Sequence, residues 1–337
     1  MNNNRTVREK ELIDSGLVSS IKSQYNGIAH NIPDFYFVLI ADYIDSMSQL
    51  ENFNVDYMAL ARSLPSVLTK VQEQNLDIYG RTDDNMITMN AGLNYETKKM
   101  FFFHELTHAL QTGKGFYNGN TGMFLTEGAT QFTAEILYHV SSGTNLNYRQ
   151  QPNVITGQPH HTPTSPLSQY QFNGSILYMF SLTTKLPLNQ ILGLAFNPNG
   201  REILKQHFEQ LQGNEGKFEE FMFDLEKIYS IEKLAWSGYG QQLSNQTPSR
   251  WILSNGATFD GNFQTQSDLM VQTQRNLMAS FVLNNDDEYV LANYQKIMDC
   301  LTTNELKIQF GNAIQEIRTM ATPQQVQQNV GTEMGTR

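Results

Sequence analysis

One segment of the sequence has residue types and spacing that fit metal-assisted hydrolysis. His104 and His108 lie four positions apart, and Glu105 follows the first histidine, in the run FFFHELTHAL that begins at Phe101. Residues i and i+4 lie on one face of a helix, so both imidazoles can reach one ion. Glu105 lies beside them, where it can accept a proton from a metal-activated water. The pattern predicts a zinc site with His104 and His108 as ligands and Glu105 as the catalytic base.

A third protein ligand is expected downstream, because a catalytic zinc takes three protein ligands and leaves the fourth position for water. Glu127 follows His108 after eighteen intervening residues, in the run FLTEGAT. His139 is the alternative, but it lies twelve residues further along the same predicted helix, which is about 18 Å along the axis. Only one of the two can face the ion. Glu127 and His139 are therefore the two candidates for the third ligand.

This constellation resembles that of the gluzincin metallopeptidases, in particular the aminopeptidase-N-like families, whose motif is His-Glu-x-x-His, eighteen residues, then Glu. Thr126 stands where those families usually have Asn. The resemblance implies that Glu127 is the third ligand. It also implies a zincin-like catalytic core, a Zn²⁺ cofactor and a peptide or protein substrate. The Gly-x-Met-Glu-Asn segment that binds a free amine in the aminopeptidases has no counterpart here. Exopeptidase specificity therefore has no support.

Two further segments resemble parts of these families. Met86 to Asn90 is similar to the edge strand that pairs with extended substrates in zincins. Tyr170 and Gly174 lie in one helix-compatible run. They are one residue further apart than the tyrosine and glycine of the Tyr-x-x-Gly pattern, which carries the transition-state tyrosine in these families. The resemblance implies a catalytic role for Tyr170 as a donor to the oxyanion. The alternative donor is His160 or His161.

Ligand histidines commonly donate their outer N–H to a second protein group, which fixes the tautomer. Gln131 and Glu135 lie four and eight residues after Glu127 on the same predicted helix. Either could accept such a hydrogen bond, and Glu135 is favoured because a carboxylate orients a ligand histidine better than an amide does.

The surrounding elements predict an α+β fold that is predominantly α. Helical periodicity covers most of residues 5 to 73, and short β-compatible runs at 76–80 and 86–90 predict a small sheet before the motif helix, Tyr95 to Thr112. A second helix is expected from Thr126 to Val140. Further helices are expected after residue 166, at 167–185, 188–196, 201–211, 218–230, 268–281, 288–301 and 305–319.

The same reading predicts how the chain is divided. Residues 1–115 form an N-terminal lobe that ends with the motif helix, and residues 116–322 form a helical C-terminal lobe that carries the third ligand. Residues 323–337 are too polar to pack and form a flexible tail. The aromatic runs at 35–37 and 101–103 are expected in the core.

Composition limits the classes of function. The 337 residues carry a formal charge of −10 with scattered basic residues, which argues against nucleic acid as a partner. The sequence contains no apolar run that could span a membrane or act as a secretory signal, so a cytoplasmic location is expected, with export without a cleaved signal left open. Cys300 is the single cysteine, so any metal must be held by His and carboxylates.

Peptide-bond hydrolysis by a zinc metallopeptidase is the function that the sequence predicts. Two alternatives share the site. One is a zincin fold kept as a binding module that holds metal without turnover. The other is a protease toxin that acts on the proteins of another cell, with the same chemistry and a different location.

Overall fold

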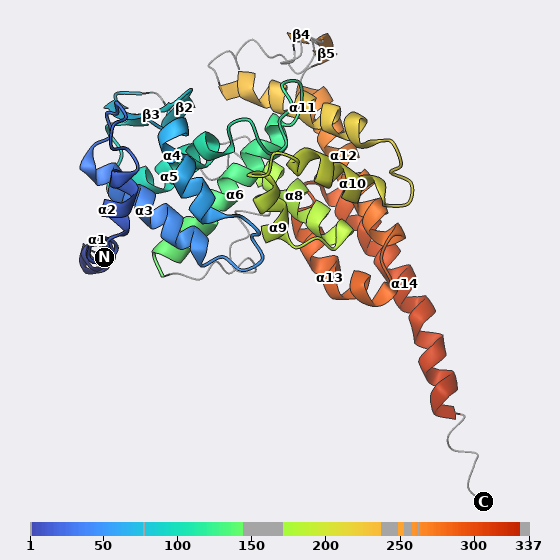
Figure 1. Ribbon diagram of the computed structural model, residues 1–337. Helices are drawn as coiled ribbons and strands as arrows, with labels where there is room; N and C mark the ends of the chain where they lie inside the picture. Colours follow the sequence, from blue (N-terminus) through green and yellow to red (C-terminus); the bar gives the residue numbers. More distant parts are fainter. Residues whose placement is uncertain are drawn as a thin grey trace, which may run out of the picture. The chain divides into compact units, whose positions relative to one another are not determined.

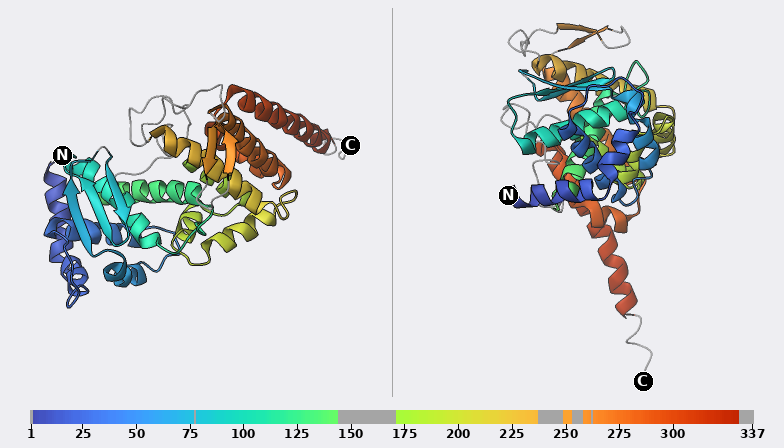
Figure 2. Two further views of the ribbon diagram at one scale, coloured as in Figure 1. Left: turned by 90° about the horizontal axis from the view of Figure 1, so that it is seen from above. Right: turned by 60° about the vertical axis from the view of Figure 1, so that its left-hand side comes forward.

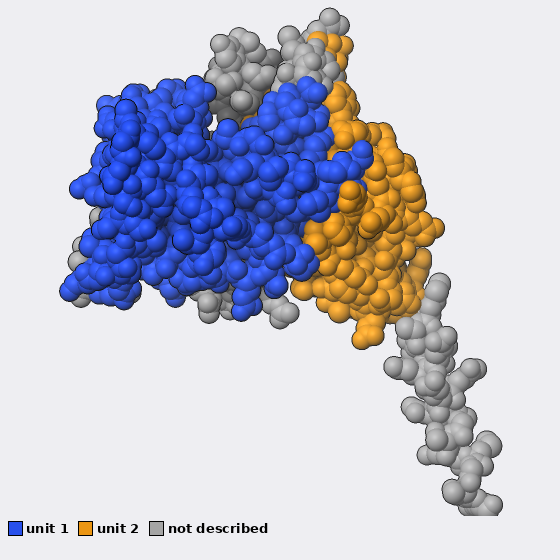
Figure 3. Space-filling model, viewed as in Figure 1, with its two compact units in different colours: residues 1–150, 187–205 blue, residues 151–186, 206–337 orange. Residues whose placement is uncertain are grey.

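The structure is a computed structural model that describes residues 2–76, 78–143, 171–236, 249–252, 258–261 and 263–330 (Figure 1). It is mostly helical with a small three-stranded sheet, which confirms the α+β, mainly α class. The chain divides into two compact units, which Figure 3 colours separately: unit 1 is 1–150 with 187–205, and unit 2 is 151–186 with 206–337. Both units are discontinuous in sequence, unlike the continuous lobes expected, because residues 187–205 return to pack in unit 1.

Unit 1 packs its helices around one long buried helix. Its elements are α1 (Asn2–Asp14), α2 (Leu17–Ser23), α3 (Asp34–Ser48), α4 (Tyr57–Val67), β1 (Lys70–Gln74), β2 (Gly80–Asp83), β3 (Met86–Asn90), α5 (Tyr95–Gln111), α6 (Met123–Ser141) and α9 (Leu188–Leu194). Helix α3 contacts α2, α4, α5 and α6. Its side chains Leu39, Ile40 and Tyr43 are fully buried, so α3 forms the centre of this core.

The sheet of unit 1 has the order β1-β3-β2, with β1 parallel and β2 antiparallel to β3. Figures 1 and 2 show the three strands beside α5, which contacts both β2 and β3. Met86–Asn90 is a strand, as expected, but it is the central strand, so the comparison with a substrate-binding edge strand is wrong for this segment. The edge strand that contacts α5 is β2, which begins at Gly80. The sequence predicts a strand that ends at this residue, at 76–80. Strand β1 was not expected, because only Val71 of it is buried.

Helix α5 has the bounds that the sequence predicts, to within one residue. It begins after Asn94, whose side chain accepts a hydrogen bond from the Thr97 amide at 3.0 Å. The aromatic run at 101–103 is buried, as expected: Phe102 and Phe103 are wholly inaccessible and pack toward Tyr36 and Tyr43 of α3. Burial of this run fixes which face of α5 is turned to the core.

Helix α6 begins earlier than expected, at Met123, because of the residue before it. Gly122 has a φ of 113°, and a Cβ there would lie 2.2 Å from the carbonyl oxygen of Phe116. Only glycine fits this backbone and this close approach. The start places Glu127 in the second turn of α6, beside α5, with which α6 makes extensive contacts.

Unit 2 is built from helices and one short hairpin. Its elements are α8 (Gln171–Thr184), the end of α10 (Gly200–Glu209), α11 (Phe218–Trp236), β4 (Ser249–Ile252), β5 (Thr258–Gly261), α12 (Phe263–Leu283), α13 (Asp287–Cys300) and α14 (Asn304–Val330). Helix α12 packs against α8, α11, α13 and α14. The expected helices are present, whereas the β4–β5 hairpin was not foreseen and α14 continues to Val330, past the expected start of the tail. No helix among the described residues is long and apolar enough to cross a membrane.

Candidate metal centre

The packing of α5 against α6 brings three potential ligand atoms of unit 1 together. The Nε2 atoms of His104 and His108 are 3.1 Å apart, and Glu127 Oε2 lies 3.1 Å from His108 Nε2 and 3.6 Å from His104 Nε2. The potential ligand atoms of these residues all lie within 4.8 Å of one another, so the group could hold a metal ion. We call these three residues the metal cluster.

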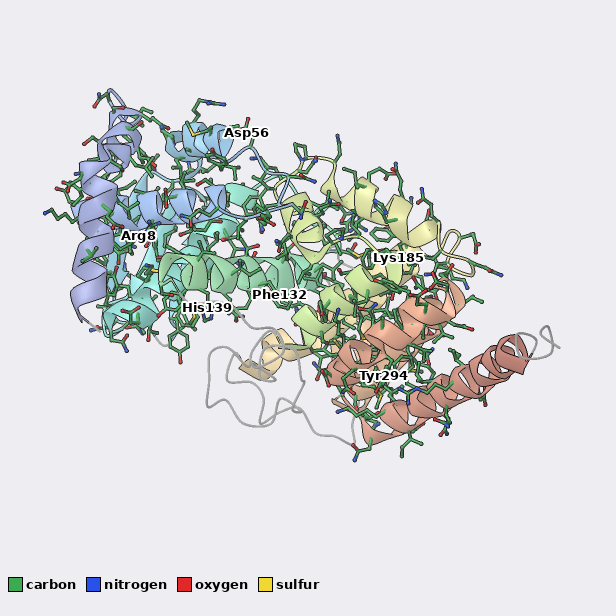
Figure 4. All side chains as sticks on the ribbon, turned by 90° about the horizontal axis from the view of Figure 1, so that it is seen from below. Arg8, Asp56, Phe132, His139, Lys185 and Tyr294 are labelled. Carbon is green, nitrogen blue, oxygen red and sulfur yellow. The ribbon has the colours of Figure 1, made fainter. Side chains whose placement is uncertain are left out.

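The position of Glu127 differs from that of an ordinary carboxylate in the first turn of a surface helix. Glu127 is buried, as is His104, while His108 keeps a partly accessible side chain. Figure 4 labels Phe132 and His139 further along α6. The cluster that could hold an ion, among the residues described, includes Glu127 and not His139. The structure therefore brings together the three residues that the sequence singles out.

The outer nitrogen of His104 faces a hydrogen-bonded chain on α6. His104 Nδ1 lies 3.0 Å from Gln131 Oε1, and Gln131 Nε2 donates to Glu135 Oε1 at 2.6 Å. Because the amide nitrogen faces Glu135, the amide oxygen faces the imidazole and can only accept. His104 therefore carries its proton on Nδ1 and directs the Nε2 lone pair toward Glu127. The sequence left Gln131 and Glu135 as alternatives, whereas the structure uses both in series.

The outer nitrogen of His108 faces a second pair of residues, which no pattern in the sequence singles out. Thr130 Oγ1 lies 3.5 Å from His108 Nδ1 and donates to Gln111 Oε1 at 2.9 Å. The hydroxyl proton is used toward Gln111, so its oxygen is left to accept from His108. Consecutive residues of α6, Thr130 and Gln131, thus support the two imidazoles of α5, and the same helix supplies Glu127.

Electrostatics in the metal cluster follow from this convergence of acceptors. Burial acts to lower the pKa of His108, but the charge and hydrogen bond of Glu127 outweigh it and the pKa is raised. Burial acts to raise the pKa of Glu127, but the charge of His108 and the close contacts with both imidazoles hold it below its ordinary value. A shared proton can therefore occupy the place of a cation. Three acceptor atoms this close need one or the other between them.

Glu135, at the end of the chain from His104, lies in a different environment. Burial raises the pKa of Glu135 to about 7, although the hydrogen bond from Gln131 acts in the opposite direction. Since Glu135 is nearly inaccessible to solvent, its charged form is poorly solvated.

Glu105 is buried against strand β2. Thr82 Oγ1 lies 2.8 Å from Glu105 Oε2 and 2.9 Å from the Glu105 carbonyl oxygen. A Cβ added to Gly80 would lie 3.1 Å from Glu105 Cγ and 3.3 Å from Oε1. The carboxylate therefore lies against Gly80 and Thr82. Sequence reasoning missed both residues, because they precede Glu105 by more than twenty positions and belong to no local motif.

The remaining expected site residues, Tyr170, His160 and His161, lie outside the described residues. The oxyanion-stabilising role stays a prediction for each of them.

Comparisons with protein-family models, with curated proteins and with solved structures found no match for this chain. What the site can do chemically therefore rests on its own geometry.

Proposed function

We propose that this chain is a zinc-dependent metallopeptidase of the gluzincin type, with a zincin-like core formed by α5, α6 and the sheet of unit 1. The observation that carries the proposal is the convergence of His104 Nε2, His108 Nε2 and Glu127 Oε2 next to the buried carboxylate of Glu105. Three ligands and an adjacent base are the parts that metal-assisted hydrolysis requires.

The donor set fits zinc. Two imidazole nitrogens and one carboxylate oxygen are typical ligands of catalytic zinc, and bond lengths of about 2.0–2.1 Å in a tetrahedron separate ligand atoms by about 3.3 Å. The separations of 3.1, 3.1 and 3.6 Å bracket that value. Two histidines with one carboxylate also suit Fe(II) in oxygenases. The neighbouring Glu105 favours hydrolysis, since hydrolysis uses a general base at this position.

The residues of the chain divide the chemistry among them. A zinc ion held by His104, His108 and Glu127 would supply Lewis-acid polarisation of the substrate carbonyl and acidify a water molecule. Glu105 accepts the proton of that water on its carboxylate and later passes it to the leaving amine. Gln131 and Thr130 hold the imidazoles in the orientation and tautomer that leave both Nε2 atoms available as ligands.

Strand β2 supports a peptide as the substrate. Asn90 N donates to Tyr79 O across the antiparallel β2–β3 register, which makes these residues a hydrogen-bonded pair. Such pairs alternate along the ladder, so the backbone groups of Gly80 and Thr82 face the other side of β2. No strand among the residues described pairs there. An extended peptide can add as a strand at this edge, next to Glu105.

The proposal is tested on the purified full chain by elemental analysis and by digestion of a peptide library read by mass spectrometry. We expect one zinc per chain and cleavage of internal peptide bonds. Glu105→Gln should keep the zinc and lose at least about 100-fold in rate, because an amide cannot accept the proton. Iron in place of zinc would contradict the proposal, as would cleavage by Glu105→Gln at the wild-type rate.

The same experiment separates the alternative functions. A chain that binds one zinc and cleaves nothing in the library would favour the binding module. Cleavage supports both a cellular peptidase and a toxin directed at another cell, which differ in location. The peptide or protein substrate stays a prediction until such cleavage is measured. The cytoplasmic location stays a prediction that cleavage does not test.

A further inference from the structure

Glu105 makes a specific contact with the edge strand that the proposed mechanism does not by itself require. Thr82 Oγ1 is within hydrogen-bonding distance of two acceptors, the Oε2 atom and the main-chain carbonyl oxygen of Glu105. The hydroxyl has one proton and can donate to only one of them at a time. The role of Thr82 depends on which acceptor receives this proton: a bond to the carboxylate orients the side chain of Glu105, whereas a bond to the carbonyl only contacts the backbone of α5.

The carboxylate is the stronger acceptor of the two. The Glu105 carbonyl lies inside α5, which continues to Gln111, so it can accept from the helical amide four residues later. A hydroxyl that donates to an ionised carboxylate forms a charge-assisted bond, roughly twice as strong as a neutral one. Thr82 therefore donates to Oε2 in the ionised state of Glu105.

This bond makes the two carboxylate oxygens of Glu105 inequivalent. Oε2 is held by Thr82, whereas Oε1 lies near Gly80, which presents no side chain. The absence of a Cβ at Gly80 leaves room for the Glu105 side chain in this position, since an added Cβ would approach Cγ to 3.1 Å. Thr82 therefore engages one lone pair of Oε2, and the two oxygens differ in their capacity to accept a further proton.

Thr82 also faces the proposed substrate edge. Its side chain contacts Glu105, and its backbone N–H and C=O groups point away from β3. The same residue can thus hydrogen bond a peptide through its main chain and the base through its side chain.

We propose that Thr82 is a positioning residue that orients the Glu105 carboxylate and couples it to a peptide bound along β2. This inference rests on the proposed function of the site. It assigns to β2 the orientation of the base as well as the binding of an extended substrate.

The test compares two substitutions at Thr82 in the zinc-loaded full chain, with a peptide that the wild type cleaves. Thr82→Val keeps the shape and removes the hydroxyl, whereas Thr82→Ser keeps the hydroxyl. We expect Thr82→Val to retain one zinc and a KM within about twofold while kcat falls about 10- to 100-fold, a part of what a general base contributes. Thr82→Ser should recover most of kcat.

Thr88→Val is the matched control. Thr88 is buried on the neighbouring strand β3, and its hydroxyl accepts from Gln72 Nε2 at 3.2 Å rather than contacting Glu105. This variant should retain the wild-type kcat. Wild-type kcat in Thr82→Val would overturn the inference, and so would equal losses in Thr82→Ser and Thr82→Val, because then the hydroxyl would not be the active group.

A crystal structure of the zinc-loaded wild type gives a second measurement that does not depend on turnover. The inference expects Thr82 Oγ1 within hydrogen-bonding distance of a Glu105 carboxylate oxygen, and a structure without this contact overturns it whether or not peptides are cleaved. Failure of the wild type to cleave any peptide would instead refute the proposed function. The two failures are therefore distinguishable.

Discussion

Two polar clusters of unit 1 both include residues of α5 and α6, and they differ in how donors and acceptors are matched. The metal cluster lies where α5 and α6 face each other at His104, His108 and Glu127. The second, which we call the charge cluster, joins α1 and α3 to the start of α5 and the end of α6. Its members are Arg8, Asp42, Lys99 and Ser141.

In the charge cluster every acceptor has a donor of its own. Asp42 Oδ1 accepts from Arg8 Nε at 3.1 Å, and Asp42 Oδ2 receives Lys99 Nζ at 2.5 Å and the Ser141 hydroxyl at 2.6 Å. The positive and negative groups face each other within the protein. In the metal cluster three acceptors face one another, and the protons of both imidazoles are directed outward. The charge cluster is complete without a ligand, whereas the metal cluster needs a cation or a proton.

The comparison also explains why both clusters lie on α5 and α6. Lys99 and Ser141 connect the helices at one end through Asp42, about one and a half turns from His104 along α5. Matched charges can fix the approach of the two helices while the unmatched acceptors remain available to an ion. The matched cluster therefore has the arrangement of a structural cluster, and the unmatched one could hold a metal ion.

The largest effect is expected from removal of the third ligand. Glu127→Ala should abolish stoichiometric zinc binding, because one of three protein ligands is lost. Glu135→Ala should weaken zinc affinity by about 10- to 100-fold through the loss of outer support, and His139→Ala should leave it nearly unchanged. Zinc affinity measured by competition with a chelator gives the ranking. A severe loss at His139 with Glu127 unaffected would refute the metal cluster as described.

The charge cluster should respond in stability rather than in metal binding. Asp42→Ala leaves Lys99 buried without its carboxylate, which should lower the free energy of unfolding by about 3–5 kcal/mol. Asp34→Ala is the control: its carboxylate is exposed and pairs with Lys22 at 2.7 Å, so the loss should stay below about 1 kcal/mol. Urea unfolding measures both. Equal losses would mean that burial of Asp42 carries no special weight.

Glu135 should give the smallest and most specific signal, a pH dependence of stability. The pKa of Glu135 is raised by burial to about 7, so between about pH 4.5 and 7 the folded protein binds this proton more tightly than the unfolded chain. The free energy of unfolding must then fall as pH rises through this window, by at most about 1.4 kcal/mol per pH unit, and level off above it.

Glu135→Gln should remove this component of the slope, since the amide does not titrate. The comparison is made on metal-free protein by denaturant unfolding at several pH values, and the difference between the two proteins isolates Glu135. Identical slopes in both proteins would show that Glu135 titrates at its ordinary pKa in the folded state.

The sequence by itself determined the local parts of this protein. Helix α5 follows from its periodicity and flanking signals, and the same-face position of His104 and His108 follows from helical geometry within four residues. The spacing from His108 to Glu127 also selected a residue that the structure brings to the cluster. The helix and the shared face depend on neighbours in the chain, so the order of residues is sufficient to predict them. The expectation for Glu127 came instead from the resemblance of the spacing to a known motif, because its contact with His108 joins two helices.

Tertiary structure alone decided the contacts between elements. Thr82 meets Glu105 because β2 pairs antiparallel with β3 in one register, and a slip of a single residue would turn its side chain to the other face of the sheet. Gln131 contacts His104, and Glu135 contacts Gln131, because the rotation of α6 about its own axis turns this face of the helix toward α5. Register and rotation are set by burial over the whole core of unit 1, which no local pattern of residues encodes.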